Sequence, residues 1–408
     1  MTARRAASAR ALAVAAVAIG LTVGAAAAAD IEPAPGDPIR GQALFVSKGC
    51  VECHAVRGTG GRIGPDLGRA AIKGSFPEIA AGLWNHSPAM GEKMRDFRVA
   101  RPTFEGNELA DLIAFLYFLN YFDEPGDPRA GKALFAEKHC IRCHAVGREG
   151  GTIGPRLDEI PRGAPPLRIA QALWNHGPAM TNAMRGMGLD PPRFRGSEFL
   201  DLVAFLRSQG ARAASREFRS AGDPEAGRRL FAEKGCARCH AVFGRGGRVG
   251  PDLGRAELRG RSVTQLAATM WNHWPAMSSA MESIGMAPPT FAGDELADVF
   301  AYIFLVRYSG PPSDPARGAA LYAERGCVRC HGAGGEGGVG PQLRGRMAGE
   351  APEEILQRMW NHAPGMLERM SSQGTTWPRF EAGELADLLT FLAAGLRTTA
   401  PARRDAPP

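Results

Sequence analysis

Apolar and polar positions follow a helical period in four similar blocks of the chain. In the first block, apolar side chains recur every three or four residues, at Leu109, Leu112, Ile113 and Leu116, which is the spacing of one helix face. The same pattern predicts a closing helix in every block, at Asn107–Phe122, Ser197–Arg207, Asp294–Tyr308 and Glu384–Leu396. The alternation typical of strands is nearly absent, so the pattern predicts an all-α protein.

An opening helix is predicted at the start of each block, where Asp-Pro precedes a short amphipathic stretch. Aspartate caps the first amides of a helix, and proline fits its first turn. The four starts are Asp37, Asp127, Asp223 and Asp314. A glycine recurs four residues later, at Gly41, Gly131, Gly227 and Gly318. Glycine inside a helix costs about 1 kcal/mol relative to alanine, so we expect close contact with the closing helix there.

A middle helix carries the sequence Trp-Asn-His-x-Pro-x-Met-x-x-x-Met in every block and is followed by Pro-x-Phe. The copies begin at Trp84, Trp174, Trp271 and Trp360. A fixed period of this size is typical of tandem domains. We assign four domains, called units 1 to 4, to residues 35–124, 125–219, 220–310 and 311–397.

The two ends of the chain differ from the units. Residues 1–29 combine Arg4, Arg5 and Arg10 with an apolar, alanine-rich run and a small-residue cleavage site, which predicts a secretory signal peptide. The alternative is an uncleaved membrane anchor, since this run is long enough to cross a bilayer. Residues 398–408 have no apolar periodicity, and we expect a disordered tail. An exported location, the periplasm in bacteria, follows as an expectation.

Composition adds little to this picture. The 408 residues have a formal net charge of +7, which includes the three arginines of the N-terminal segment. Without these three arginines the charge is +4 (+7 − 3), so we infer no nucleic-acid partner from it.

All eight cysteines lie in four boxes, each a Cys-x-x-Cys pair followed at once by histidine. The cysteine pairs are Cys50 and Cys53, Cys140 and Cys143, Cys236 and Cys239, and Cys327 and Cys330. The histidines are His54, His144, His240 and His331. Cys-x-x-Cys-His is the attachment signature of haem c, in which both thiols bind the porphyrin and the histidine binds the iron. Zinc ribbons place their cysteine pairs about 15–20 residues apart, whereas these boxes lie 90 to 96 residues apart.

A loop ending in Gly-Pro-x-Leu follows each box. Its prolines are Pro65, Pro155, Pro251 and Pro341. We expect each proline carbonyl to accept a hydrogen bond from the second ring nitrogen of the histidine, which would fix the orientation of that ligand.

In this order of elements the chain resembles the class I cytochrome c family over about residues 35–397. The resemblance rests on the opening helix, the Cys-x-x-Cys-His box, the Gly-Pro-x-Leu loop, the methionines, Pro-x-Phe and the closing helix. It implies an all-α domain wrapped round each of four covalently bound haem c groups, electron transfer, and a distal methionine ligand. In that family the methionine directly precedes Pro-x-Phe, but this chain has Arg101, Pro191, Pro288 and Trp377 there.

The distal iron ligand therefore has three candidate sets. The first choice is Met90, Met180, Met277 and Met366, which align with the ligand of the family. The second set is Met94, Met184, Met281 and Met370. The third is His86, His176, His273 and His362. For the repeated Trp-Asn-His we expect either hydrogen bonds to haem propionates or, for the tryptophan, plain core packing.

Three classes of function remain. The leading hypothesis is an exported tetrahaem carrier with redox protein partners and no small-molecule substrate. An electron-transfer subunit of a larger membrane or extracellular complex is the alternative, and the aromatic closing helices of units 1 and 3 could dock a partner or be buried between units. A haem peroxidase or reductase needs an open iron site in one unit, which four such similar copies do not favour.

Overall fold

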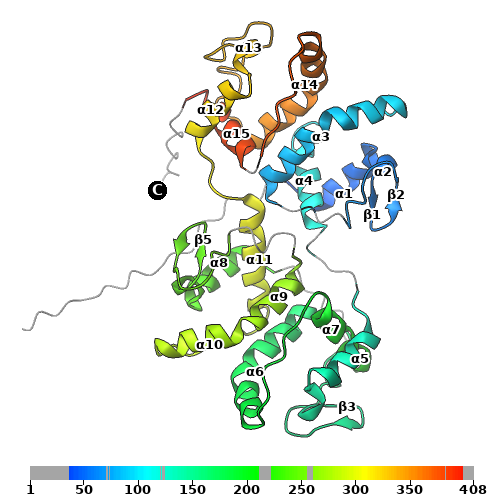
Figure 1. Ribbon diagram of the computed structural model, residues 1–408, viewed down its shortest axis with the longest axis vertical. Helices are drawn as coiled ribbons and strands as arrows, with labels where there is room; N and C mark the ends of the chain where they lie inside the picture. Colours follow the sequence, from blue (N-terminus) through cyan, green and yellow to red (C-terminus); the bar gives the residue numbers. More distant parts are fainter. Residues whose placement is uncertain are drawn as a thin grey trace, which may run out of the picture.

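The computed structural model describes residues 36–69, 72, 74–119, 121, 125–210, 222–254, 261–381 and 383–397. The described chain is mostly helical, so the all-α prediction is confirmed (Figure 1). The predicted signal peptide and the predicted tail lie outside the described residues.

Each unit contains an opening helix, a short turn at the cysteine box, a long middle helix and a closing helix. Unit 1 has α1 (Pro38–Ser47), α2 (Cys50–Cys53), β1 (Ala55–Val56), β2 (Thr59–Gly60), α3 (Phe76–Asp96) and α4 (Glu108–Phe118). Unit 2 has α5 (Pro128–Glu137), η1 (Cys140–Arg142), β3 (Ala145–Val146), β4 (Glu149–Gly150), α6 (Pro166–Gly186) and α7 (Glu198–Gln209).

Units 3 and 4 vary this plan. Unit 3 has α8 (Pro224–Glu233), η2 (Cys236–Arg238), β5 (Ala241–Val242), β6 (Arg245–Gly246), α9 (Val263–Asn272), α10 (Trp274–Ser283) and α11 (Glu295–Ser309). Unit 4 has α12 (Pro315–Glu324), α13 (Val328–His331), α14 (Pro352–Ser372) and α15 (Glu384–Ala393). The middle helix of unit 3 is interrupted at His273, directly before Trp274 and a proline. The three small antiparallel hairpins were not predicted.

The opening and closing helices cross at the repeated glycine, as predicted. A Cβ on Gly41 would overlap the main-chain carbonyl of Asp111 on α4, and the glycines of the other units meet their closing helices in the same way. The Asp37 carboxylate accepts hydrogen bonds from the amides of Ile39 and Arg40, while its own amide donates to the Asp111 side chain at 2.7 Å. The predicted helix starts are thus confirmed.

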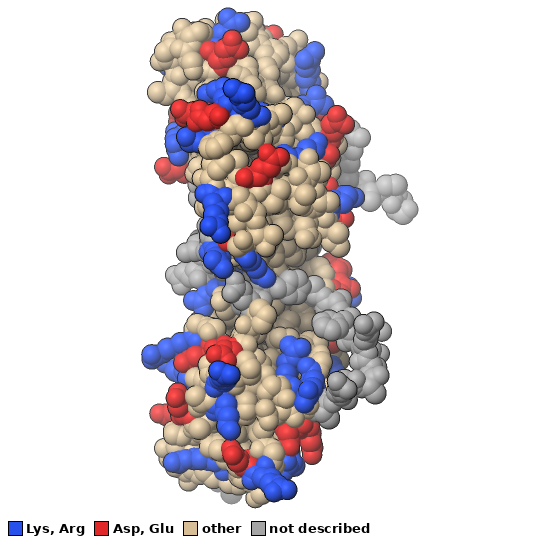
Figure 2. Space-filling view, turned by 90° about the vertical axis from the view of Figure 1, so that its right-hand side faces the viewer, with Lys and Arg blue, Asp and Glu red and all other residues tan. Residues whose placement is uncertain are grey.

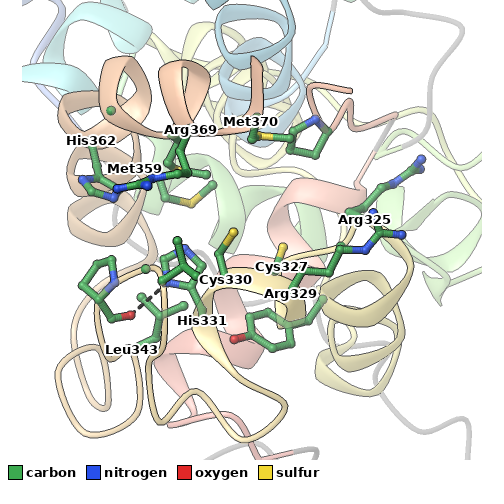
Figure 3. A pocket seen from close by; sticks show the side chains of 18 of the residues that line it. Arg325, Cys327, Arg329, Cys330, His331, Leu343, Met359, His362, Arg369 and Met370 are labelled. Carbon is green, nitrogen blue, oxygen red and sulfur yellow. Dashed lines mark hydrogen bonds between the residues drawn. The ribbon is translucent and has the colours of Figure 1, made fainter. Parts of the chain in front are cut away.

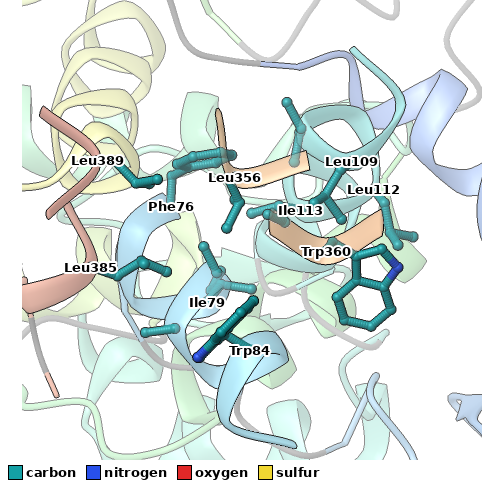
Figure 4. Close-up of a cluster of buried hydrophobic side chains, with 14 of the residues drawn as sticks. Phe76, Ile79, Trp84, Leu109, Leu112, Ile113, Leu356, Trp360, Leu385 and Leu389 are labelled. Carbon is teal, nitrogen blue, oxygen red and sulfur yellow. The ribbon is translucent and has the colours of Figure 1, made fainter. Parts of the chain in front are cut away.

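The four units form two pairs that do not follow the order of the sequence. Units 1 and 4 make up one half of the molecule, and units 2 and 3 make up the other half (Figure 1). The two large hydrophobic clusters divide mostly in the same way, although Val263, Phe304 and Tyr308 of unit 3 join the cluster of units 1 and 4. In Figure 4, Trp84 and Ile79 from α3 and Ile113 from α4 pack against Trp360 from α14 and Leu385 from α15. The hydrophobic core therefore extends from the inside of each unit into the interface between the paired units.

Hydrogen bonds from the Trp-Asn sequence hold units 1 and 4 together. The indole of Trp84 donates to the carbonyl of Pro378 at 2.8 Å. The Asn85 side chain exchanges two hydrogen bonds with the main chain of Phe380, at 2.8 and 2.9 Å. The same three bonds run in the opposite direction from Trp360 and Asn361 to the Pro-x-Phe segment of unit 1. We call each such set a Trp-Asn clamp.

Units 2 and 3 are joined by the same reciprocal clamps. Trp174 and Asn175 bind the Pro-x-Phe segment of unit 3 at Pro289 and Phe291. Trp271 and Asn272 bind the corresponding segment of unit 2. The tryptophans are buried, which confirms their packing role. The prediction that the tryptophans bind propionates is wrong, because the one N–H of each indole is used between units.

The two halves meet at the aromatic closing helices of units 1 and 3. The hydroxyl of Tyr117 on α4 donates to the carbonyl of Phe304 on α11 at 2.9 Å, and their rings lie 4.7 Å apart. The Tyr308 ring lies 4.6 Å from Tyr117 and is fully buried. Burial between units, one of the two interpretations of these aromatic helices, is confirmed.

The outer surface shows no strong segregation of charge on the face drawn in Figure 2, where Lys, Arg, Asp and Glu side chains are interspersed. Within the described residues, every helix is too short or too polar to cross a bilayer.

Candidate haem site

Each cysteine box forms a single tight turn at the end of the opening helix. In unit 1, Gly49 has a φ of 76° and starts the turn, and the amide of His54 donates to the carbonyl of Cys50 at 2.9 Å. His139 takes the position of Gly49 in unit 2 with a φ of 64° and is exposed. The turn brings both cysteines and the histidine of one box to the same place, as attachment of one group requires.

A main-chain carbonyl fixes the histidine of every box. The Nδ1 atoms lie 2.9 to 3.0 Å from the carbonyl oxygens of Pro65, Pro155, Pro251 and Pro341. This confirms the predicted contact. With Nδ1 as the donor, Nε2 is left with a free lone pair for a metal.

The glycine before each of these prolines gives the histidine ring its room. A Cβ on Gly64, Gly154, Gly250 or Gly340 would overlap the imidazole of the preceding box. The repeated Gly-Pro is therefore explained at both positions, since glycine accommodates the ring and proline accepts its hydrogen bond.

Unit 4 contains a cavity of about 700 Å³ between its box and its middle helix. Its lining includes Cys327, Cys330 and His331 on one side and Met359, His362 and Met370 of α14 on the other (Figure 3). Thr375, Thr376 and Pro378 also line it. A cavity of this size suits an organic cofactor, and the cysteines stand at its edge as thioether formation requires.

All three candidates for the distal ligand of unit 4, His362, Met366 and Met370, line this cavity. Met90, Met180, Met277 and Met366 are half-buried at one place in every unit, and they pack against the edges of the two cores. The second set is not uniform, because Met184 and Met281 are 8% and 7% exposed, whereas Met94 and Met370 are half-buried.

The histidines of the middle helices are held by their own helix in three units. Nδ1 of His86 lies 2.8 Å from the carbonyl of Gly82, one turn earlier, and His176 and His273 make the same contact. In unit 4, burial lowers the pKa of His362, and the nearby His331 lowers it further.

Exposed apolar side chains beside each box also fit a porphyrin. Ile63, Ile153, Val249 and Val339 directly precede the Gly-Pro of their units and are 44 to 75% exposed. In unit 4 this side chain, Val339, lines the cavity, where an apolar cofactor would cover it. The first thiol of each box is buried, which raises the pKa of Cys50, Cys140, Cys236 and Cys327 to about 11. The residues present therefore fit a covalently bound haem.

The sequence did not reveal that part of the cavity wall is shared between units. Pro378 and Asn361 line the cavity of unit 4 and also belong to the clamps with unit 1. A signal for specific pairing does exist in the sequence. Gly177 and Trp274 occupy the same repeat position, and in the structure Trp274 lies against Gly177, so the smallest residue faces the largest.

Comparison with protein families agrees with this site. A model of the cytochrome c family matches residues 39–119, 128–210 and 224–304. A second model, described as cytochrome C oxidase, cbb3-type, subunit III, matches residues 313–392. Searches of curated proteins and of solved structures find no significant match.

Proposed function

The chain belongs to the cytochrome c family, and on that basis we propose that it is an exported carrier with four haem c groups that passes electrons between redox protein partners. The observation that carries this proposal is the four-fold recurrence of one complete site. Every unit has two cysteines, a histidine and a proline carbonyl 2.9 to 3.0 Å from the histidine Nδ1.

The side chains have distinct roles in this proposal. The eight cysteines hold the groups covalently, and His54, His144, His240 and His331 bind the iron through Nε2. When bound, haem supplies reversible one-electron chemistry at its iron. The helices round each site would hold the side chains that bind the group in place.

For the distal ligand we propose Met90, Met180, Met277 and Met366. A side chain that faces a cofactor cavity is half-exposed when only protein atoms surround it, and these four have that environment in every unit. Met184 and Met281 are instead covered by protein, which supports a packing role for the second set. The histidines remain the third possibility.

Absorption spectroscopy of the purified holoprotein tests the carrier proposal. We expect a mass increment of four haems, a ferric charge-transfer band from methionine bound to iron, and little binding of carbon monoxide by the ferrous protein. Met90→Ala should remove one quarter of that band, whereas Met94→Ala should leave it unchanged. High-spin ferric iron, or carbon monoxide binding at one haem in four, would instead support an enzyme.

A second candidate is an electron-transfer subunit of a larger membrane complex. It is favoured by the match of unit 4 to a model described as an oxidase subunit. Isolation from native membranes in mild detergent would distinguish the two. Co-purification with an oxidase would support the subunit, and recovery from the soluble extracytoplasmic fraction would support the free carrier. Recovery there would also support the proposed periplasmic location and cleavage of residues 1–29.

A further inference from the structure

The wall of the unit 4 cavity is also the surface that docks on unit 1. Asn361 lines the cavity, and its amide exchanges two hydrogen bonds with the main chain of Phe104. Pro378 lines it as well, and its carbonyl accepts the indole N–H of Trp84 at 2.8 Å. Asn361 belongs to α14, whose labelled residues His362 and Met370 lie across the cavity from His331 in Figure 3. Both Asn361 and Pro378 contact unit 1.

The equivalent residues of unit 1 face unit 4 in the same way. Asn85 and Trp84 lie on α3 directly before His86, and Pro102 of unit 1 accepts the indole N–H of Trp360 at 3.0 Å. Because the clamps are reciprocal, the Trp-Asn sequences and Pro-x-Phe segments of units 1 and 4 form one shared layer of contacts between the two units. Units 2 and 3 repeat this arrangement through Trp174 and Trp271.

Contacts between the pairs are of a different kind. They join units 1 and 3, where Tyr117 of α4 and Tyr121, three residues beyond the end of α4, pack on Phe304 of α11. The amide of Val263 in unit 3 also donates to the carbonyl of Tyr121 in unit 1. Among the described residues, no helix of unit 1 packs extensively on unit 2, and no helix of unit 3 packs extensively on unit 4.

We propose that the four haem sites are connected in the order 2, 3, 1, 4, with close coupling within the pairs 2–3 and 1–4. Units 2 and 4 are then the two ends of the path, where redox protein partners donate and accept electrons. In each step one electron leaves a ferrous haem, which is oxidised, and reduces the ferric haem of the next unit, with no bond made or broken. This inference rests on the proposed carrier function.

Pulsed electron paramagnetic resonance of the fully oxidised holoprotein tests the order. We expect two short iron–iron distances, one in each pair, and a longer distance between units 1 and 3. Cys327→Ala with Cys330→Ala, which removes the haem of unit 4, should abolish one short distance and shift the reduction potential of haem 1 alone. The matched variant Cys140→Ala with Cys143→Ala should abolish the other short distance and shift the potential of haem 3 alone.

A shift at haem 3 on removal of haem 4, with haem 1 unchanged, would overturn the order, since that is the result of coupling along the sequence. A haem-free unit could misfold, so Asn361→Ala, which retains every attachment cysteine, is the second variant. It should change the short distance of pair 1–4 and leave that of pair 2–3 as it is, and an equal change in both would contradict the proposal. Carbon monoxide binding tests the carrier function separately. It is measured on the ferrous protein, whereas the iron–iron distances are measured on the oxidised protein.

Discussion

The pair of units 1 and 4 and the pair of units 2 and 3 use the same clamps but fill the space between them differently. In pair 2–3, Trp274 is 1% exposed, lies edge-on to Trp174 at 4.9 Å, and donates to the Thr181 hydroxyl at 2.9 Å. The facing position is Gly177, whose missing side chain leaves room for the indole.

Pair 1–4 has small residues, Ser87 and Ala363, at these two positions. Its space is filled from the residue before Pro-x-Phe. Trp377 stacks on Trp84 with ring centroids 4.4 Å apart and donates to the Trp84 carbonyl at 3.2 Å. Arg101 lies over the Trp360 ring at 4.2 Å. The clamps are thus the same in both pairs, whereas the residues that fill the space between the units differ.

The largest loss of stability is expected when the buried indole between units 2 and 3 is removed. Trp274→Ala should lower the free energy of unfolding by about 3–5 kcal/mol, because a fully buried indole leaves a cavity. Thermal unfolding followed by haem absorbance measures the loss. Trp377→Ala in pair 1–4 is the matched variant and should cost less, since Trp377 is only half-buried. Equal losses would contradict this difference between the pairs.

A larger side chain at Gly177, which faces Trp274, should also destabilise pair 2–3. Gly177→Leu should cost about 1–3 kcal/mol, because the new side chain meets the Trp274 ring. The double variant Gly177→Leu with Trp274→Ala should recover part of that stability in denaturant titration. Gly186→Leu, on the same helix and in open space, is the control and should not destabilise the protein.

The clamps should contribute equally to both pairs. Asn85→Ala removes two hydrogen bonds to Phe380 and should cost about 1–2 kcal/mol. Asn175→Ala does the same at Phe291 and should cost the same amount. Hydrogen exchange at the Phe380 and Phe291 amides reports each loss separately. A loss confined to one variant would show that the clamps are not equivalent.

Arg101 should matter to pair 1–4 alone. Arg101→Gln removes the contact with the Trp360 ring and the 2.7 Å hydrogen bond to the Ser87 hydroxyl. The expected loss is about 1 kcal/mol, measured as a shift in the urea midpoint. Pro288→Ala, at the equivalent position of pair 2–3, serves as the comparison and should change the midpoint less.

The smallest effect on stability should come from an ion pair that occurs separately in each half of the molecule. The Lys234 ammonium donates to Glu295 at 2.7 Å and holds the pKa of that carboxyl below its usual range, against the opposing effect of burial. A lowered pKa stabilises the fold above the unfolded value of about 4.3, and this contribution is lost as the pH falls through the folded pKa.

Glu295→Gln should therefore lower stability at pH 7 by less than about 1 kcal/mol. The difference from the unchanged protein should vanish in acid, as thermal unfolding at several pH values would show. Glu108→Gln in unit 1 is the matched variant from the other half, because Lys48 forms the same ion pair there at 2.8 Å. A difference that persists in acid would mean that packing, and not charge, is responsible.

Local signals in the sequence were sufficient for the units but not for their arrangement. Asp37 before a proline predicted a helix start, and Gly64-Pro65 predicted the contact with His54, because both depend on neighbours close in the chain. The partners of Trp84 and Asn85 lie nearly 300 residues away. Since every unit carries the same clamp, the repeated residues alone did not indicate which units pair.

The break in the middle helix of unit 3 also escaped prediction, because all four units have a proline at this position. In units 1, 2 and 4 that proline lies inside a continuous helix. Unit 3 alone has a bulky Trp274 directly before it, which is buried in the interface. Packing across units thus overrides a local pattern that all four units share.

Units 2 and 3, which pair with each other, lie between units 1 and 4 in the sequence, and this order has a consequence for folding. A chain is made from its N-terminus, so unit 1 emerges first but finds its partner last. Its interface residues, among them Ile79 and Trp84, stay uncovered while the inner pair assembles, and closure of the outer pair must bring together segments separated by most of the chain. Unit 1 is therefore the part of the newly made protein with the longest exposure to aggregation, and assembly is complete only when α14 and α15 have formed.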